Sequence, residues 1–258
     1  MGGRVEGKVA VVTGGAMGLG AVQARLLAEE GATVIVTDVA EQEAAAVVAG
    51  LARPGAFIAH DVASEAAWDR VEAEVMDRYG RLDVLVNNAA ILISGSIEEL
   101  SFADWKKLQA VNADSAFLGC RAAVRMMKAS GGAGSIVNIV SVASHVGEPY
   151  AVGYCGAKGA VRSMTKSVAI HCMQSGYRIR CNSVHPGSMA TPMVRKLREA
   201  RGLADADPSW GDPKQVAYTT LYLASDESLM VNGAEILVDS GRTVAPPAPG
   251  AWPPPATV

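Results

Sequence analysis

Tyr154 and Lys158 are the residues whose types and spacing most clearly suggest chemistry. They stand four apart at the start of a helix predicted near 152–175, so they share one helix face. A phenol has a pKa of about 10 and is a poor base at neutral pH, but a nearby ammonium favours the phenolate and lowers that pKa. The pair predicts an acid/base centre of the kind that alcohol oxidation needs, although many helices carry the same spacing on a solvated face.

Further polar residues follow predicted strands. Ser141 lies thirteen residues before Tyr154, just past the strand predicted over Ser135–Val140. Open α/β sheets bind ligands at the carboxyl ends of their strands, so we expect the Ser141 hydroxyl to hold a substrate oxygen that Tyr154 protonates. Asn112 stands inside a helix predicted near 101–129, where Asn is a poor helix former that often needs a specific reason.

A glycine-rich turn, Thr13-Gly14-Gly15-Ala16-Met17-Gly18-Leu19-Gly20, joins the first predicted strand to the first helix. Glycines let the chain turn sharply and let backbone N–H groups approach a pyrophosphate, and the helix N-terminus favours an anion. The position of the turn favours dinucleotide binding over a tight turn alone. No Gly-Lys-Ser/Thr follows, which disfavours a P-loop.

Asp38 ends the second predicted strand, a little under twenty residues after Gly20. A carboxylate there can accept hydrogen bonds from ribose hydroxyls and repels a 2′-phosphate. No Arg or Lys occurs in 14–20 or directly after Asp38, so the sequence predicts NAD rather than NADP as the cofactor. The segment from Asp38 to Glu41 also fits a capping box for the next helix, and both roles can coexist.

Short β-branched runs alternate with longer helical patterns, which predicts one α/β domain over residues 1–245. We expect a Rossmann-like, doubly wound, parallel seven-stranded sheet with helices on both faces. Residues 187–211 form a long connection typical of a substrate loop. The tail, 246–258, carries six prolines and is expected to be extended or disordered. The predicted strands are Val9–Thr13, Thr33–Thr37, Ala56–Ala59, Val84–Asn87, Ser135–Val140, Arg178–Ser183 and Glu235–Val238, and the helices lie near 18–30, 41–51, 64–79, 101–129, 152–175 and 213–225. In the fourth helix, Phe102, Trp105, Leu108 and Val111 predict a core-facing stripe.

The composition excludes several classes of protein. A net charge of −3 gives no reason to expect nucleic acid or an anionic membrane as a partner. The apolar runs are too short to span a bilayer and no leader pattern opens the chain, so we expect a cytoplasmic protein. The histidines are scattered and the cysteines match no zinc or redox spacing, so no metal is indicated. We expect reduced thiols in or near the core: Cys120, Cys155, Cys172 and Cys181.

Taken in order, these motifs closely resemble the short-chain dehydrogenase/reductase family, of the single-domain type. The resemblance runs from Gly7 to Thr243 and rests on TGGAMGLG, Asp61-Val62, NNAA at 87–90, Asn112, Ser141, Tyr154/Lys158, HPG at 185–187 and VDSG near 238. It implies a catalytic tetrad of Asn112, Ser141, Tyr154 and Lys158. Tyr154 would be the acid/base, Ser141 would orient the substrate, Lys158 would bind the nicotinamide ribose and tune Tyr154, and Asn112 would hold a water that completes a proton relay.

The resemblance also implies the contacts of the cofactor. Asp61 and Val62 would meet the adenine, Asn88 and Ala89 would lie under the cofactor, and the residues after the sixth strand would bracket the nicotinamide. The full set is Gly14, Met17, Gly18, Leu19, Gly20, Asp38, Val39, Asp61, Val62, Asn88, Ala89, Tyr154, Lys158, Pro186, Gly187, Ser188 and Thr191.

Some positions depart from the family pattern. Ala90, Val140, Cys155-Gly156 and Ser240 stand where Gly, Ser, Ser-Ala and Gly are common, and none of these changes removes a chemical group that the mechanism needs. Within the family, the chain looks most like bacterial secondary-alcohol dehydrogenases that act on alicyclic alcohols such as cyclopentanol or on 3α(20β)-hydroxysteroids. An apolar ketone fits the expected wall of the substrate pocket. That wall comprises Ile91, Leu92, Val142, His145, Met189, Met193 and Val194, together with Ser141 and Tyr154.

Two other functions stay open from the sequence. One is an NADPH-dependent 3-ketoacyl-thioester reductase, which Asp38 disfavours. The other is a non-catalytic dinucleotide-binding regulator or scaffold, which the presence of all four tetrad residue types disfavours. The resemblance also implies a homotetramer assembled through the long helical segments 101–129 and 152–175.

Overall fold

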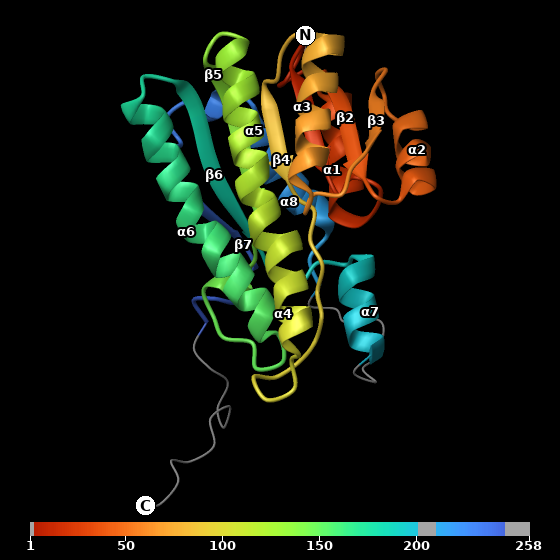
Figure 1. Cartoon of the computed structure of the whole chain (residues 1–258), viewed down its shortest axis with the longest axis vertical. Helices are drawn as coiled ribbons and strands as arrows, with labels where there is room; N and C mark the ends of the chain where they lie inside the picture. The colour runs from red at the N-terminus through yellow and green to blue at the C-terminus, as the bar shows by residue number, and fades with distance from the viewer. Residues whose placement is uncertain (1–2, 201–209, 246–258) are drawn as a thin grey trace, which may run out of the picture.

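One parallel sheet organises the chain in the computed structural model, which describes residues 3–200 and 210–245 (Figure 1). Its strand order is β3-β2-β1-β4-β5-β6-β7, and every pairing is parallel. The order reverses direction between β1 and β4, which defines a doubly wound sheet. The strands are β1 (Val9–Thr13), β2 (Thr33–Asp38), β3 (Ala56–Ala59), β4 (Val84–Asn87), β5 (Ala133–Ile139), β6 (Arg178–Pro186) and β7 (Glu235–Val238).

Helices cover both faces of the sheet. The side that faces the viewer in Figure 1 carries α3, α5 and α6, while α1 and α8 lie behind the strands. The helices are α1 (Gly18–Glu29), α2 (Glu41–Ala49), α3 (Glu65–Tyr79), α4 (Phe102–Gln109), α5 (Ser115–Ala129), α6 (Val152–Gln174), α7 (Pro192–Ala200) and α8 (Pro213–Ala224). The predicted single-domain, doubly wound fold is therefore confirmed.

The alternation of side chains along β1 shows why the strand is apolar throughout. All five of its residues are buried. Successive side chains of a strand point to opposite faces, so Val12 packs into the core under α1 and α8, and Val11 packs into the core under α3, α5 and α6. A strand whose two faces are both covered by helices needs apolar side chains on both faces. Their burial stabilises the sheet at whose edge the cavity described below lies.

The helix predicted over 101–129 is interrupted. A π-helical segment, Ala110–Asp114, separates α4 from α5 and contains Asn112. Such segments are rare and often lie at functional sites. The predicted core-facing stripe is wrong at its first member: Leu108 is fully buried, but Phe102 is 72% exposed, with the Lys106 ammonium 5.2 Å from its ring centre.

The connection after β6 contains α7, and hydrogen bonds join its two ends. The backbone N–H of Ala190 donates to Gly211 (3.1 Å), and that of Gly211 donates to Ser188 (2.9 Å), so the two ends of the segment meet. These bonds fix the start of α7 at the carboxyl edge of the sheet. Residues 201–209 of the predicted loop and the tail, 246–258, lie outside the described residues, so the predicted limits of the domain and its tail stay predictions.

The four cysteines are free thiols, three of them buried (Cys120, Cys172 and Cys181) and Cys155 partly buried. The structure thus places them in or near the core. Among the described residues, the helices are too short or too polar to cross a membrane.

Candidate active site

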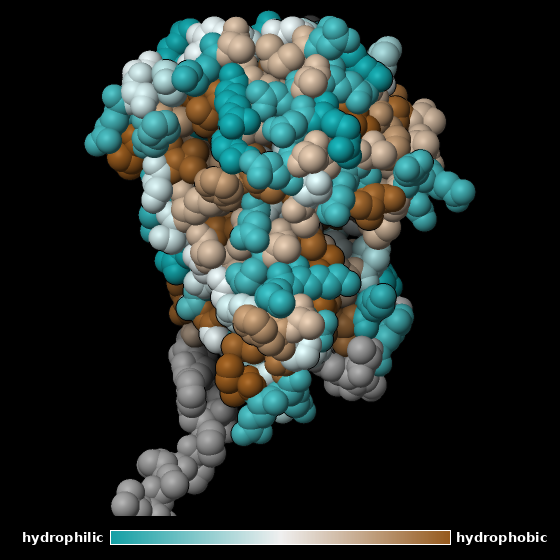
Figure 2. Space-filling view, in the orientation of Figure 1, coloured by the Kyte–Doolittle hydropathy of each residue, from teal (hydrophilic) through white to brown (hydrophobic). Residues whose placement is uncertain are grey.

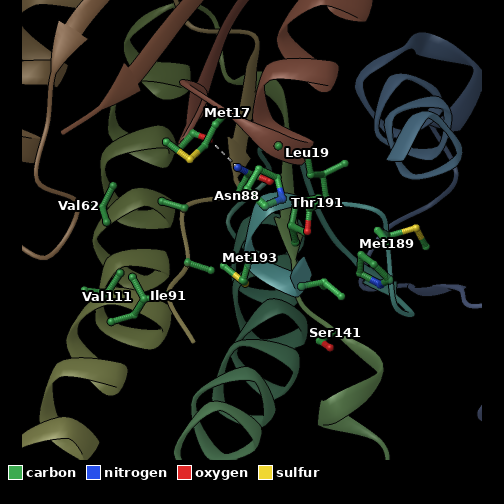
Figure 3. A pocket seen from close by; sticks show the side chains of 18 of the residues that line it. Met17, Leu19, Val62, Asn88, Ile91, Val111, Ser141, Met189, Thr191 and Met193 are labelled. Carbon is green, nitrogen blue, oxygen red and sulfur yellow. Dashed lines mark hydrogen bonds between the residues drawn. The ribbon is translucent and has the colours of Figure 1, made fainter. Parts of the chain in front are cut away.

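A cavity of about 430 Å³ opens at the carboxyl ends of the strands, where the strand order reverses between β1 and β4. Open α/β sheets bind ligands at this point. Figure 3 shows Met17, Leu19, Asn88 and Thr191 close together at one end of the cavity. Ile91, Val111 and Met193 form an apolar wall, and Ser141 lies beyond them.

The glycines of the first turn allow close backbone approach. Gly14 has a positive φ of 63°, and a Cβ there would lie 2.7 Å from the Cα of Ala89. A Cβ on Gly20 would lie 2.2 Å from the carbonyl oxygen of Gly14. Gly14 and Gly18 line the cavity, whereas Gly20 does not. Gly20 therefore lets α1 pack against the turn, and its predicted contact with the cofactor stays a prediction.

The segment after β4 holds this turn in place. The Thr13 hydroxyl accepts hydrogen bonds from the backbone N–H of Asn88 (3.0 Å) and of Ala89 (3.1 Å). The side-chain amide of Asn88 donates to the carbonyl oxygens of Thr13 (2.9 Å) and Gly14 (3.1 Å). These four bonds fix the floor of the cavity, so the backbone cradle for a pyrophosphate is rigid.

Asp38 directs its carboxylate to the edge of the cavity. One oxygen accepts a hydrogen bond from the backbone N–H of Ala16 (3.0 Å), and the other accepts one from Ala40 (3.1 Å). The alternative capping box is wrong, because α2 begins at Glu41 with Ala40 as its N-cap and no side-chain cap. The carboxylate keeps free acceptor sites toward the cavity, so the residues fit an adenosine ribose there.

His60 also lines the cavity, next to Asp61 and Val62, and the sequence analysis missed it. Its side chain is 2% exposed, and its Nδ1 lies 3.0 Å from the Thr37 hydroxyl. Burial lowers the pKa of His60 to about 4, so the imidazole is neutral at neutral pH. The available signal was its position: His60 directly follows β3, as Asn88 directly follows β4.

Tyr154, Ser141 and Lys158 meet at the inner part of the cavity, and all three line it. The Ser141 oxygen accepts the backbone N–H of Ala143 (3.1 Å), and the Ser141 side chain lies near enough to Tyr154 to lower the pKa of the phenol. The buried Lys158 ammonium donates to the carbonyl oxygen of Ile139 (2.8 Å) and lies 5.7 Å from the centre of the Tyr154 ring. This arrangement can deliver one proton to an oxygen held between Ser141 and Tyr154.

The predicted depression of the phenol's pKa is wrong for this structure. Burial raises the pKa of Tyr154 to about 12, and the hydrogen bond from Ser141 only partly offsets that rise. Burial also lowers the pKa of Lys158 to about 8. The apolar surroundings disfavour both the Tyr154 phenolate and the Lys158 ammonium, and the lysine donates its hydrogen bond to the Ile139 carbonyl instead of to the phenol. At neutral pH the phenol therefore holds its proton, which suits a general acid.

Asn112 is buried beside the cavity but does not line it. Its side-chain oxygen accepts the backbone N–H of Ile91 (2.9 Å), and its amide donates to the Ile91 carbonyl (3.0 Å). The side chain thus clamps the wall of the cavity, and the predicted water-holding role of Asn112 stays a prediction.

Most other predicted residues lie where expected. The cavity lining includes Met17, Leu19, Val39, Asp61, Val62, Asn88, Ala89, Ala90, Ile91, Pro186, Gly187, Met189, Thr191, Met193 and Val194. Ser188, Leu92, Val142 and His145 are not part of this lining, so their predicted contacts with cofactor or substrate stay predictions. The Ser188 hydroxyl instead accepts from Arg242 (2.8 Å), and His145 turns away toward His185, with their ring nitrogens 3.0 Å apart.

Comparison with known proteins agrees with this site. A family model described as "Enoyl-(Acyl carrier protein) reductase" matches residues 14–243. The chain is 39% identical to an NADP-dependent (R)-specific alcohol dehydrogenase of Lentilactobacillus kefiri, covering 93% of this chain and 98% of the relative. It is 42% identical to a 3-alpha-(or 20-beta)-hydroxysteroid dehydrogenase of Mycobacterium bovis, covering 95% and 92%. It is 40% identical to a cyclopentanol dehydrogenase of a Comamonas species, covering 93% and 99%.

A solved structure, that of gox2181, has the same fold. It superimposes with a TM-score of 0.87 at 31% identity and covers 94% of this chain and 98% of its own. The fold and the site define an oxidoreductase of the CH–OH group that uses a nicotinamide dinucleotide. The chain belongs to the short-chain dehydrogenase/reductase family.

Proposed function

We propose that this protein is an NAD-dependent dehydrogenase that interconverts a secondary alcohol, alicyclic or steroid-like, and its ketone, with Tyr154 as the acid/base. The observation that carries the proposal is that Ser141, Tyr154 and Lys158 line one largely apolar cavity together with the glycine turn. A bound nicotinamide dinucleotide supplies or accepts the hydride. Ser141 and Tyr154 hold the substrate oxygen and exchange its proton.

The choice of NAD rests on charge. Asp38 and Asp61 line the cavity, and Lys158 is the only lysine or arginine among the described residues that line it. A 2′-phosphate near Asp38 would meet a carboxylate and no compensating cation. The name of the Lentilactobacillus relative specifies NADP, so the proposal predicts that the two chains differ in cofactor choice.

The apolar wall supports the substrate class. Ile91, Val111, Met189, Met193 and Val194 line the same cavity as Ser141 and Tyr154. Methionines adapt to irregular apolar shapes, so ring systems fit such a wall. Apart from Lys158, the described lining holds no lysine or arginine, so it offers no basic entrance for a carrier-bound thioester, which disfavours the 3-ketoacyl-thioester reductase.

A panel of secondary alcohols tests the proposal. Cyclopentanol, cyclohexanol and a hydroxysteroid are each incubated with NAD⁺ or NADP⁺, and the appearance of reduced cofactor is followed by absorbance. We expect turnover with at least one cyclic alcohol and a preference for NAD⁺. Activity only with acetoacetyl thioester and NADPH would establish the reductase, and cofactor binding with no turnover of any of these substrates would favour a scaffold.

The proposal includes a cytoplasmic homotetramer with neither nucleic acid nor membrane as a partner. Apolar side chains reach the surface over α4, α5 and α6, among charged ones (Figure 2). They include Phe102, Phe117 and Met173, exposed by 72%, 51% and 57%. Contact with other copies would bury them. Light scattering is expected to give four times the mass of one chain, and a monomer at micromolar concentration would contradict the proposal.

A further inference from the structure

A buried polar network lies behind Ser141, on the side away from the cavity. Its centre is His185, which is fully buried near the end of β6. The Nδ1 atom of His185 lies 3.0 Å from the Ser144 hydroxyl and 3.3 Å from the carbonyl oxygen of Ser141. It also lies 3.0 Å from Nε2 of His145, and the opposite ring nitrogen lies 2.9 Å from the Ser183 hydroxyl. Both nitrogens of the ring therefore have partners.

The turn that carries Ser141 is held at two carbonyl groups. The Ser144 hydroxyl donates to the carbonyl oxygen of Ser141 (2.7 Å). Arg162 donates to the carbonyl oxygen of Ser144 (3.1 Å) and, through Nε, to Glu235 (2.8 Å). The network thus connects α6, β6 and β7 to a turn of five residues. Because none of these side chains lines the cavity, they can act on the reaction only through Ser141 and its neighbours.

A metal ion is not the natural occupant of this cluster. His145, His185 and Glu235 offer ligand atoms within 4.8 Å of one another. Glu235, however, already pairs with Arg162 and Lys166, with nitrogen–oxygen distances of 2.8 and 2.5 Å. A bound cation would compete with both of these charges, and it would also break the contact between the two histidines. The cluster is therefore a hydrogen-bonding network.

The direction of the Ser141 hydroxyl depends on this turn. Its oxygen accepts the N–H of Ala143, which leaves its proton free for Tyr154 or for a substrate oxygen. Moving the Ser141 or Ser144 carbonyl would rotate that N–H, and the hydroxyl would follow it. Displacements well below 1 Å alter proton-transfer geometry enough to slow a reaction measurably.

We propose that His185 and Ser144 are positioning residues that set the orientation of the Ser141 hydroxyl toward Tyr154. This inference rests on the proposed function, in which Ser141 holds the substrate oxygen. Neither residue touches substrate or cofactor. Their contribution is expected in kcat and not in cofactor affinity.

The test compares Ser144→Ala, His185→Phe and His185→Asn with Ser163→Ala, which removes an exposed hydroxyl from the same helix as Arg162. Ser144→Ala and His185→Phe are expected to lower kcat about tenfold, with the NADH dissociation constant and the thermal midpoint of Ser144→Ala little changed. Asn places a polar atom near the position of Nδ1, so His185→Asn should restore most of the loss. Ser163→Ala should match the wild type.

A double-mutant cycle with Ser141→Ala separates positioning from general stabilisation. If Ser144 acts through Ser141, adding Ser144→Ala to Ser141→Ala causes no further loss of kcat. Equal and independent losses in both backgrounds would overturn the inference. Full turnover by Ser141→Ala would instead overturn the proposed function.

A crystal structure of Ser144→Ala gives a readout that needs no substrate. The inference predicts that the Ser141 hydroxyl rotates away from Tyr154. An unmoved hydroxyl would overturn it, whichever substrate the enzyme uses.

Discussion

The side chain of Asn112 forms a pair of hydrogen bonds with the backbone of Ile91, one accepted from its N–H (2.9 Å) and one donated to its carbonyl (3.0 Å). Asn112 lies in the π-helical segment between α4 and α5, and Ile91 forms part of the cavity wall. These two hydrogen bonds therefore join the π-helical segment to the wall of the cavity.

Asn112→Ala should impair both stability and turnover. The change leaves the N–H and the carbonyl of Ile91 without partners, which costs about 1–3 kcal/mol when such groups are buried. Because Ile91 would no longer be held in place in the cavity wall, kcat/KM for a cyclic ketone should also fall by about tenfold or more. Urea unfolding and steady-state kinetics measure the two effects. Wild-type stability in this variant would show that the clamp is unimportant.

Lys158→Met should change how stability depends on pH. Burial lowers the pKa of Lys158 to about 8, against about 10.5 in the unfolded chain. Between these values the unfolded state binds the extra proton, so the lysine makes the wild type more stable as pH rises through this window. The variant lacks this gain of up to about 3 kcal/mol. Urea unfolding of both proteins at pH 7.5 and pH 9.5 measures the free energy of unfolding at each pH. The same change with pH in the wild type and in the variant would contradict the prediction.

Asp38→Asn should weaken the preference for NAD. The amide keeps an oxygen that can accept the Ala16 N–H, but it removes the negative charge at the cavity edge. We expect the ratio of kcat/KM for NADP⁺ to that for NAD⁺ to rise by about 10- to 100-fold. An unchanged ratio would mean that another group selects the cofactor. Glu41→Gln, one turn away at the start of α2, removes a charge without this contact and serves as the control.

Two glycines of α6 should respond in opposite ways to alanine. A Cβ on Gly159 meets nothing within 4 Å, so Gly159→Ala should stabilise the helix by about 0.5–1 kcal/mol. A Cβ on Gly153 would lie 2.6 Å from Leu108 and 2.9 Å from Leu100, so Gly153→Ala should destabilise the protein and disturb the adjacent Tyr154. Thermal unfolding of the two variants tests this contrast. A stabilised Gly153→Ala would show that α4 can move aside.

The fold could be predicted well because short apolar runs typical of strands alternate with longer helical patterns along the sequence. A polar or glycine residue directly follows β1, β3, β4, β6 and β7, so these strand ends and the residues beyond them could be placed before their contacts were known. The helix predicted near 101–129 is helical throughout, but the sequence did not predict its π-helical segment around Asn112, whose side chain makes two contacts with Ile91.

The chemistry was harder to predict than the positions. The spacing of Tyr154 and Lys158 placed them together, but it could not reveal that burial would outweigh their attraction. His145 was expected at the substrate wall, yet its partner His185 lies forty residues later on another strand. His60 was missed for the same reason, since its contact with Thr37 joins two strands. Such distant contacts carry no local pattern.

Replacing Tyr154 with phenylalanine tests the central claim most directly, because the ring and its packing remain while the hydroxyl is lost. With a cyclic ketone that the wild type reduces, the account predicts that kcat falls by about 10²- to 10⁴-fold. Circular dichroism and NADH affinity should stay as in the wild type. A folded Tyr154→Phe protein that binds NADH and turns over at the wild-type rate would contradict the account.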